Sequence, residues 1–447
     1  MLGEPKAAIR GMVLPFLLAF AVVEINQFVD TFWVSGLGVR AASAVTTVVP
    51  FYGLIMCIGL GLSAGVTATI AYRLGKGDRE VASKLAVGAI ISCTILSIAA
   101  SVLIFFSFDV LIDVLGAQEI RAESWDYVLP YICMSPVINL LAIVGGMLRA
   151  EGAAKRSTII QSTSAILNMI IDPILIYVLG MGVMGAGLST IVSAGIALVL
   201  GLYWYISGKT VVRLDRSMFR IDKAAMSEVW GIGGPKTVQM ILSNVTDFIQ
   251  RIFLIIAGGT VAVMLYNYAW RYIGLAMLPS KSVEAAMLPI CSSAFGMNDL
   301  EKMKTGYLYS LKIVFVFAII LSIIICVFAE PLISIMTYEE SMKELFSQFV
   351  WTLRFSIWVL PMTALACVAS SMLQAMKKAK IPMYFFMFWA VLKLVVYALA
   401  AYGYFGIDPF EAIIYSMLGL QAFSGISLWL FAKVEYGKVV RVKATNA

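Results

Sequence analysis

Ile166-Leu-Asn-Met-Ile-Ile-Asp-Pro-Ile-Leu-Ile-Tyr177 carries one acid, Asp172, in a stretch that is otherwise almost entirely apolar. The 447-residue chain is 61% hydrophobic and only 13% charged, whereas soluble domains contain about 25% charged residues. Such a stretch belongs in a bilayer, where an ionisable side chain is costly and by default marks a functional site. Asn168 precedes Asp172 by one helical turn on the same face, and Asp30 occupies an equally apolar segment.

The rest of the chain is divided into segments of similar character. A membrane helix needs about 20 mostly apolar residues, and twelve segments meet this requirement. They run over 8–37, 41–71, 80–107, 125–148, 156–179, 183–206, 228–257, 260–292, 302–328, 345–373, 377–402 and 408–433. We therefore predict an all-α integral membrane protein of twelve helices in two bundles. The amino-terminal bundle is 1–207, a cytoplasmic linker is 208–227, the carboxy-terminal bundle is 228–433, and a cytoplasmic tail is 434–447.

The two halves resemble each other at matching turns. Gly75-Lys-Gly-Asp78 follows the second segment as Gly296-Met-Asn-Asp299 follows the eighth, and Arg149-Ala-Glu-Gly-Ala-Ala-Lys-Arg156 is echoed by Gln374-Ala-Met-Lys-Lys-Ala-Lys380. Because each half holds six segments, both halves enter the membrane from the same side. The pattern predicts a parallel internal repeat, with its axis along the membrane normal.

The net charge of +7 follows membrane topology and does not indicate a nucleic-acid partner. With the N-terminus inside, the opposite-side loops hold only Arg40, Arg121 and Lys343 among the basic residues. The positive-inside rule then predicts a multi-pass protein of the cell (inner) membrane with both termini in the cytoplasm. The chain has no His, and its six Cys are scattered singly. We therefore expect neither an enzyme nor a bound cofactor.

The first segment holds a second candidate group. Asn26 and Asp30 are four residues apart on one helical face, so the amide can orient the carboxylate. Pro15 removes a backbone donor and predicts a bend in this helix. A helix that contains a titratable group and a proline could settle in two shapes that depend on its charge.

The fifth and sixth segments supply further oxygen ligands. Pro173 follows Asp172 directly and frees the carbonyl of Met169, and Thr190 follows small glycines that permit close approach. Asp30, Asn168, Asp172 and Thr190 would form an all-oxygen pocket. Hard cations prefer such ligands, and two close carboxylates also favour protonation of one of them. The residues alone do not decide whether the coupling ion is H⁺ or Na⁺. The four residues would be metal ligands only if the ion is Na⁺.

The second half lacks an acid at the corresponding place. The position that matches Asp30 is Gln250 or Arg251. Several charges there have partners at helical spacing, Asp247 with Arg251 and Lys281 with Glu284, so we expect local pairing. The cation site is therefore predicted in the first half alone.

These motifs resemble the multidrug and toxic compound extrusion (MATE) transporters, in particular their damage-inducible (DinF-like) branch. The matching pieces are Pro15, Asn26, Val29-Asp-Thr-Phe-Trp-Val34, Arg149-Ala-Glu-Gly152, Asn168, Asp172-Pro173, Gly185-Ala-Gly187 and Thr190. The resemblance implies that Asp30, Asn168, Asp172 and Thr190 form the cation site, with Tyr127 nearby and Pro15 as the kink.

The resemblance also implies a function. We expect a monomeric antiporter in the lipid bilayer that exports small amphiphilic, often cationic, organic compounds in exchange for H⁺ or Na⁺. The alternative is a flippase for a lipid-linked saccharide or another lipid, because the second half is rich in basic residues and a pyrophosphate needs cations. A channel, a receptor or an enzyme fits less well, since no filter loop, ring of charges or activated nucleophile is evident.

Overall fold

The computed structural model describes residues 3–114, 117–215, 222–336 and 340–445, and their regular structure is entirely helical. An α-helix satisfies every backbone hydrogen bond within its own segment, which a chain in hydrocarbon requires. The first half comprises α1 (Pro5–Ser35), α2 (Val39–Lys76), α3 (Arg79–Val114), α4 (Arg121–Ala150), α5 (Ala154–Pro173) and α6 (Gly182–Ile206). The second half comprises α7 (Lys223–Ala276), α8 (Leu278–Gly296), α9 (Leu300–Val327), α10 (Ala329–Met336), α11 (Glu340–Lys343), α12 (Phe346–Ser356), α13 (Val359–Ala375), α14 (Lys380–Ala401) and α15 (Pro409–Thr445).

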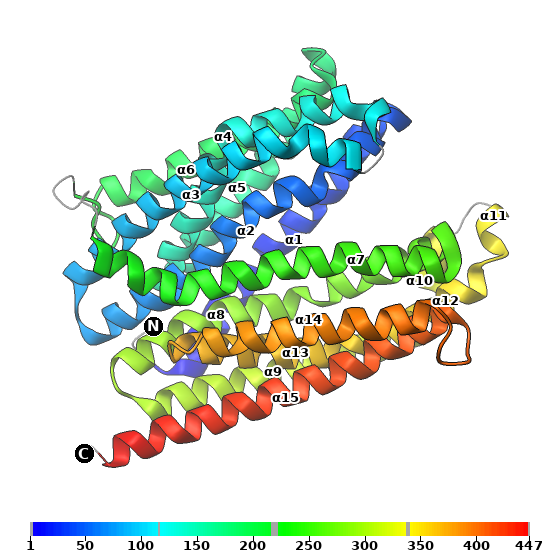
Figure 1. The fold of residues 1–447 in the computed structure, drawn as a ribbon. Helices are drawn as coiled ribbons and strands as arrows, with labels where there is room; N and C mark the ends of the chain where they lie inside the picture. Colours follow the sequence, from blue (N-terminus) through cyan, green and yellow to red (C-terminus); the bar gives the residue numbers. More distant parts are fainter. Residues whose placement is uncertain (1–2, 115–116, 216–221, 337–339, 446–447) are drawn as a thin grey trace.

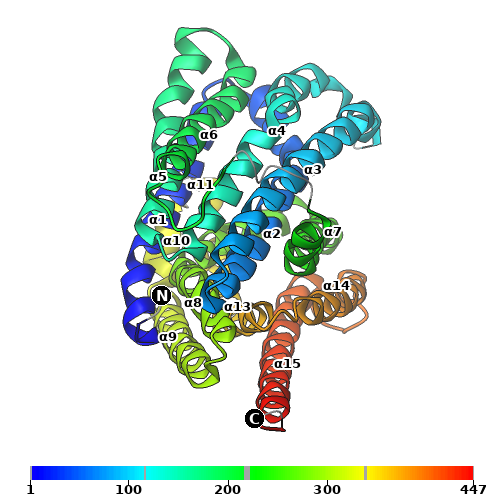
Figure 2. The same cartoon turned by 90° about the vertical axis from the view of Figure 1, so that its left-hand side faces the viewer.

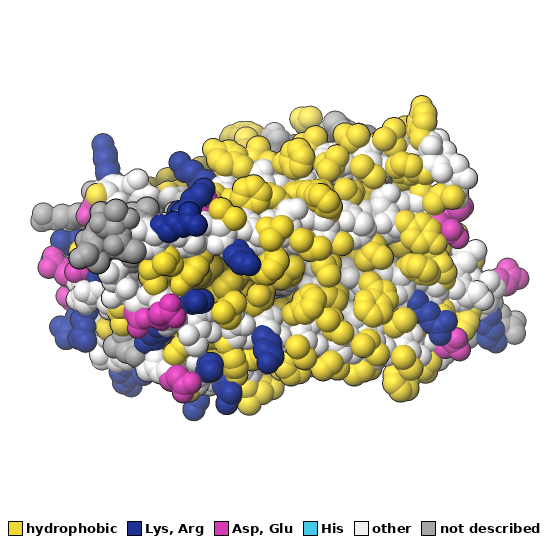
Figure 3. Space-filling model, turned by 90° about the horizontal axis from the view of Figure 1, so that it is seen from below, with side chains coloured by type: hydrophobic (Ala, Val, Ile, Leu, Met, Phe, Trp, Pro, Cys, Tyr) yellow, Lys and Arg dark blue, Asp and Glu magenta, His cyan; other side chains and the backbone are white. Residues whose placement is uncertain are grey.

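The long helices run roughly along one axis in two groups, α2–α6 above and α7–α15 below in Figure 1, with α1 beside α5 and α8. Figure 2 shows the same two groups from the end. Hydrophobic side chains form a broad band around the middle, while Lys and Arg gather mainly at one end (Figure 3). Eleven helices of the described chain are long and apolar enough to cross a membrane. The predicted all-α membrane fold is confirmed.

The number is eleven and not the predicted twelve because segment seven and the first part of segment eight form one continuous 54-residue helix, α7. Gly258 and Gly259 leave helical geometry in the middle of α7, with φ of −160° and 65°, where the sequence predicts the boundary between the two segments. The eighth segment is completed by α8, which begins with Leu278-Pro279. At the other end of this half, α15 continues past the predicted segment end at 433 as far as Thr445.

The turns of the internal repeat share one backbone motif. Gly77 after α2 and Asn298 after α8 both have positive φ, as do Gly152 after α4 and Lys377 after α13. In each turn the next amide donates to the carbonyl five residues earlier, at 2.8–3.0 Å, which closes the helix end in the Schellman manner. The side chains at these positions differ, so it is the backbone geometry that the two halves have in common.

The two groups of helices meet most closely where α2 crosses α7 and α8. A methyl group on Gly65 of α2 would lie 2.6 Å from the backbone nitrogen of Gly233 and 2.7 Å from the carbonyl oxygen of Val229, both on α7. Backbone atoms cannot yield to such an overlap as a flexible side chain could. Gly65 therefore fixes how closely the two bundles approach each other.

We expect Gly65→Ala to lower the melting temperature in detergent by several degrees, although alanine normally stabilises a helix by about 0.5–1 kcal/mol relative to glycine. Gly231→Ala on α7 is the matched control, because its added methyl meets no atom within 4 Å. This control should be neutral or stabilising. A thermal scan in which both variants shift in the same direction would contradict the proposed contact.

Candidate functional site

Asn168 is the centre of a polar network between α1, α5 and α6. Its Oδ1 accepts a hydrogen bond from Nδ2 of Asn26 on α1 at 2.6 Å. Its Nδ2 lies 3.0 Å from Oδ1 of Asp172, 3.0 Å from Oγ of Ser189 and 3.4 Å from Oγ1 of Thr190. Asn168 and Asp172 are buried, at 4% and 0% exposure. The amide therefore connects three helices at one depth of the first bundle.

Asp30 and Asp172 approach each other from α1 and α5, and their carboxyl groups lie within hydrogen-bonding reach. Ser189 and Asn168 donate to one oxygen of Asp172. The other oxygen of Asp172 and Oδ1 of Asp30 are buried without a donor among the described residues. Two bare carboxylates so close together repel each other strongly in a medium of low dielectric. A proton or a small cation between them would remove that repulsion.

Three tyrosines and one serine complete the site. Tyr127 is 1% exposed, and its hydroxyl lies 3.3 Å from that of Tyr131. Tyr131 stacks on Tyr52 of α2, with ring centroids 4.7 Å apart, and its hydroxyl lies within reach of Thr190. The predicted group of Asp30, Asn168, Asp172, Thr190, Asn26 and Tyr127 is thus assembled in one place. Sequence reasoning missed Ser189, Tyr131 and Tyr52, although Ser189 is adjacent to the predicted Thr190.

The two prolines have different consequences for their helices. α1 continues through Pro15 as one helix from Pro5 to Ser35. After Pro173 the chain forms one π-helical turn, Ile174–Val178, which directly follows the acid. Wide turns of this kind frequently occur at functional sites. One irregular stretch of the first bundle therefore begins two residues after Asp172, and a second interrupts α4 at Met134, with φ of −123°.

The equivalent region of the second half has different chemistry. Counted from the matched turns at Gly152 and Lys377, Asn168 corresponds to Lys393 and Asp172 to Tyr397. Lys393 on α14 interacts with Asp247 on α7. The side-chain amine of Lys393 thus occupies the position that corresponds to Asn168, the central amide of the first half.

The prediction of local pairing in the second half is wrong for Lys281 and Glu284. Lys281 lies 3.7 Å from Glu24 of α1, so this pair connects the two halves. Glu284 instead accepts a hydrogen bond from Ser371 at 2.8 Å. Asp247 interacts electrostatically with Arg251, as predicted, and also with Lys393 of α14, although neither contact is among the ion pairs of the described residues. Helical spacing places charges on one face, but helix rotation decides which partner each charge meets.

A second cluster joins the halves at the end of the molecule that holds the matched turns. Glu228 of α7 accepts from Arg73 of α2 at 2.7 Å and from Lys377, after α13, at 2.7 Å. The ammonium of Lys377 also lies 3.6 Å from the ring centre of Tyr72. One carboxylate thus connects both halves, and we call Arg73, Glu228 and Lys377 the Glu228 cluster.

Comparison with known proteins identifies the family. The MatE family model matches residues 15–174 and 235–399, one stretch in each half. The chain belongs to the MatE family. This MatE protein is 26% identical over 350 residues to an FAD transporter of Shewanella oneidensis, covering 77% of each chain. It is 23% identical over 353 residues to the multidrug export protein MepA of Staphylococcus saprophyticus, covering 77% of this chain and 75% of that one.

The structural likeness extends over nearly the whole chain. A multidrug resistance MATE family transporter of the MOP superfamily, solved in an outward-facing conformation, superposes with a TM-score of 0.92 at 25% identity. The match covers 98% of this chain and 97% of that one. The family resemblance and the multi-pass membrane character are confirmed, and the relatives are transporters and not enzymes. The assignment to the DinF-like branch stays a prediction.

We expect Asn168→Ala to lower the melting temperature more than Asn26→Ala, because it removes the hydrogen bonds of the amide to Asn26, Asp172 and Ser189 and leaves the amide of Asn26 without its partner. An unsatisfied buried polar group costs about 1–3 kcal/mol. The double variant should be little worse than Asn168→Ala alone, since the two amides share one hydrogen bond. Additive losses in thermal scans of the three variants would contradict this network.

Proposed function

We propose that this chain is a cation-coupled antiporter that exports amphiphilic organic compounds by alternating access. The observation that carries the proposal is the Asp30–Asp172 carboxyl pair in the membrane region, in which one oxygen of each group is buried and receives no hydrogen bond from a described donor. Intramembrane acids in such a setting mark ion and proton pathways. The relatives support transport of small molecules, while their names differ in the compound transported.

The coupling ion that we propose is the proton. Two carboxyl groups within hydrogen-bonding reach need one proton between them and no further ligand. A hard metal cation instead needs several converging oxygens. Here the amide of Asn168 presents its nitrogen to Asp172 and its oxygen to Asn26. The residues of the site thus fit a shared proton more directly than they fit Na⁺.

The Glu228 cluster supports the alternating-access part of the proposal. It joins the halves at the end where Lys and Arg gather, which the positive-inside rule assigns to the cytoplasm. A cavity between α1 and α7 is lined by residues from the half of α1 that is farther from the N-terminus, and by α7 residues before and after the Gly258–Gly259 break. We propose that this arrangement is the outward-facing state, and that the Glu228 cluster opens when the site faces inward.

The flippase alternative is also supported by one observation. Arg251 and Arg271 line the cavity between the bundles, and a lipid pyrophosphate would require cations at such a place. A flippase has no need of a titratable pair in the first bundle. The coupled antiporter therefore accounts for more of the structure.

We expect Asp30→Asn and Asp172→Asn each to abolish substrate transport driven by a pH gradient in proteoliposomes, because the amide cannot exchange a proton. Transport by the unmodified protein should respond to a pH gradient and not to a Na⁺ gradient. The matched control is Asp247→Asn, which makes the same change in the other bundle and should retain pH-driven transport. Transport that survives in Asp30→Asn but is lost in Asp247→Asn would move the coupling site to the second half.

We expect Glu228→Gln to favour the inward-facing state, because it removes the charge that holds Arg73 and Lys377 together. In a cysteine-free background, a cysteine at Ser293, which is buried beneath Gly75, should react several-fold faster with maleimide in this variant. Glu123→Gln is the control, since its ion pair with Arg40 (2.8 Å) connects α2 and α4 within one half. Equal labelling rates in all three proteins would contradict the role of the cluster.

A further inference from the structure

A cavity of about 430 Å³ lies between the two halves of the chain. Glu24, Gln27, Phe28 and Thr31 of α1 form one wall, and α7 provides the other wall with residues on both sides of its break, from Arg251 to Leu275. A neighbouring cavity of about 610 Å³ shares Asn267 and Arg271 with it. These volumes are in the range of small-molecule sites, about 300–1,000 Å³.

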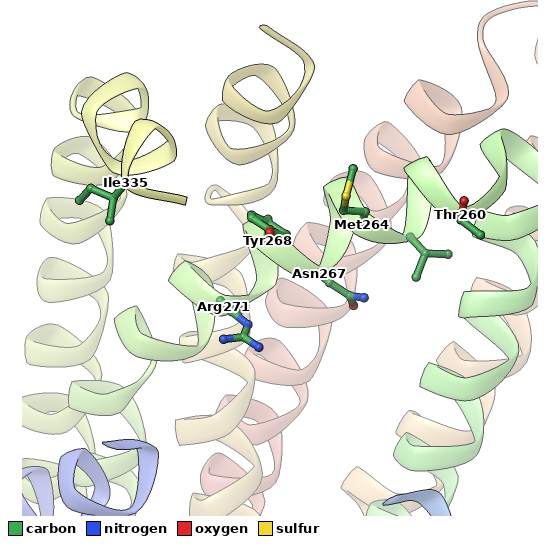
Figure 4. A pocket seen from close by; sticks show the side chains of 7 residues that line it. Thr260, Met264, Asn267, Tyr268, Arg271 and Ile335 are labelled. Atoms are coloured by element: carbon green, nitrogen blue, oxygen red, sulfur yellow. The ribbon is translucent and has the colours of Figure 1, made fainter. Parts of the chain in front are cut away.

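Two arginines set the charge of this cavity. No ion pair of the described residues involves Arg251 or Arg271, and the one acid in the lining, Glu24, is already 3.7 Å from Lys281. Asp247 lies one helical turn before Arg251, and its carboxylate interacts electrostatically with both Arg251 and Lys393. Figure 4 shows the guanidinium of Arg271 and the amide of Asn267 pointing to the same side of α7. The lining therefore has more positive than negative charge.

Unpaired guanidinium groups are costly at membrane depth and face cavities or ligands there. Arginine presents a planar set of donors that matches a phosphate or carboxylate in a bidentate manner. Phe28 and Trp270 lie in the same lining, and the guanidinium of Arg271 is 5.0 Å from the ring centre of Phe28. An aromatic ligand can pack on these rings while its anionic group binds the arginines.

We propose that this cavity binds amphiphilic organic anions, with a phosphate or carboxylate held by Arg251 and Arg271 and an apolar, preferably aromatic, body against Phe28 and Trp270. The inference rests on the proposed transport function and specifies its substrate class. It departs from the expectation of often cationic substrates, which came from the family resemblance and not from the residues of the cavity.

The test is equilibrium binding to the purified full-length protein in detergent, followed by ligand fluorescence. Flavin mononucleotide and riboflavin share one aromatic ring system and differ in a single phosphate. We expect flavin mononucleotide to bind at least tenfold more tightly, and Arg251→Gln or Arg271→Gln to reduce its affinity about tenfold without changing that of riboflavin. Arg10→Gln is the matched control, because Arg10 is an exposed arginine of α1 outside this cavity.

The remaining outcomes either overturn the proposal or narrow it. Equal binding of the two flavins, or an unchanged affinity in both arginine variants, would overturn the proposal, as would tighter binding of tetraphenylphosphonium than of flavin mononucleotide. Displacement of flavin mononucleotide by short-chain phosphatidylglycerol would support the anion site and assign it to a lipid headgroup, whereas lack of displacement would support a soluble anion. Because binding is measured without a gradient, phosphate-dependent binding without any transport would contradict the antiporter and leave the anion site intact.

Discussion

The packing of the first bundle depends on how two carboxyl groups are neutralised within an apolar medium. Asp30 and Asp172 come from α1 and α5, and neither has a basic partner among the described ion pairs. Their contact is therefore stable only with a proton or cation between them. Asn168 and Ser189 hold Asp172 in place from α5 and α6, so the position of α1 is the variable that responds to charge. In the proposed mechanism, the coupling ion and the arrangement of the helices are thus linked by one contact.

The two halves of the internal repeat carry different chemistry at matching positions. The turns match in backbone conformation, yet the positions of Asn168 and Asp172 carry Lys393 and Tyr397 in the second half. An ammonium group attached to the chain cannot dissociate and diffuse away as a bound ion does. The second half therefore has an acid and a base where the first half has two acids, and a pair of similar bundles differs in charge.

The sequence predicts the parts of the site that helical periodicity and membrane energetics determine. Asn168 with Asp172, and Asn26 with Asp30, share faces because four residues nearly complete one helical turn. The acids are conspicuous because their surroundings are apolar. Ser189, Tyr52 and the Glu24–Lys281 pair were beyond such reasoning, because each depends on how one helix is rotated against another. The same limit applies to Arg251, for which the sequence predicted a local partner and the structure provides none within ion-pair distance.

Helix α1 contributes residues both to the Asp30–Asp172 site and to the cavity between α1 and α7, so the two sites are physically connected. Asn26 and Asp30 face the polar network of the first bundle, while Glu24, Gln27, Phe28 and Thr31 line the cavity. At 100° per residue these sets lie on different faces of one helix. A change in protonation that moves α1 against α5 therefore moves Phe28 relative to Arg271. A ligand shifts such an equilibrium only through its differential affinity for the two states. In the proposed mechanism, an anion bound between α1 and α7 has that differential affinity, because the α1 wall of its site moves with the protonation of Asp30 and the α7 wall does not.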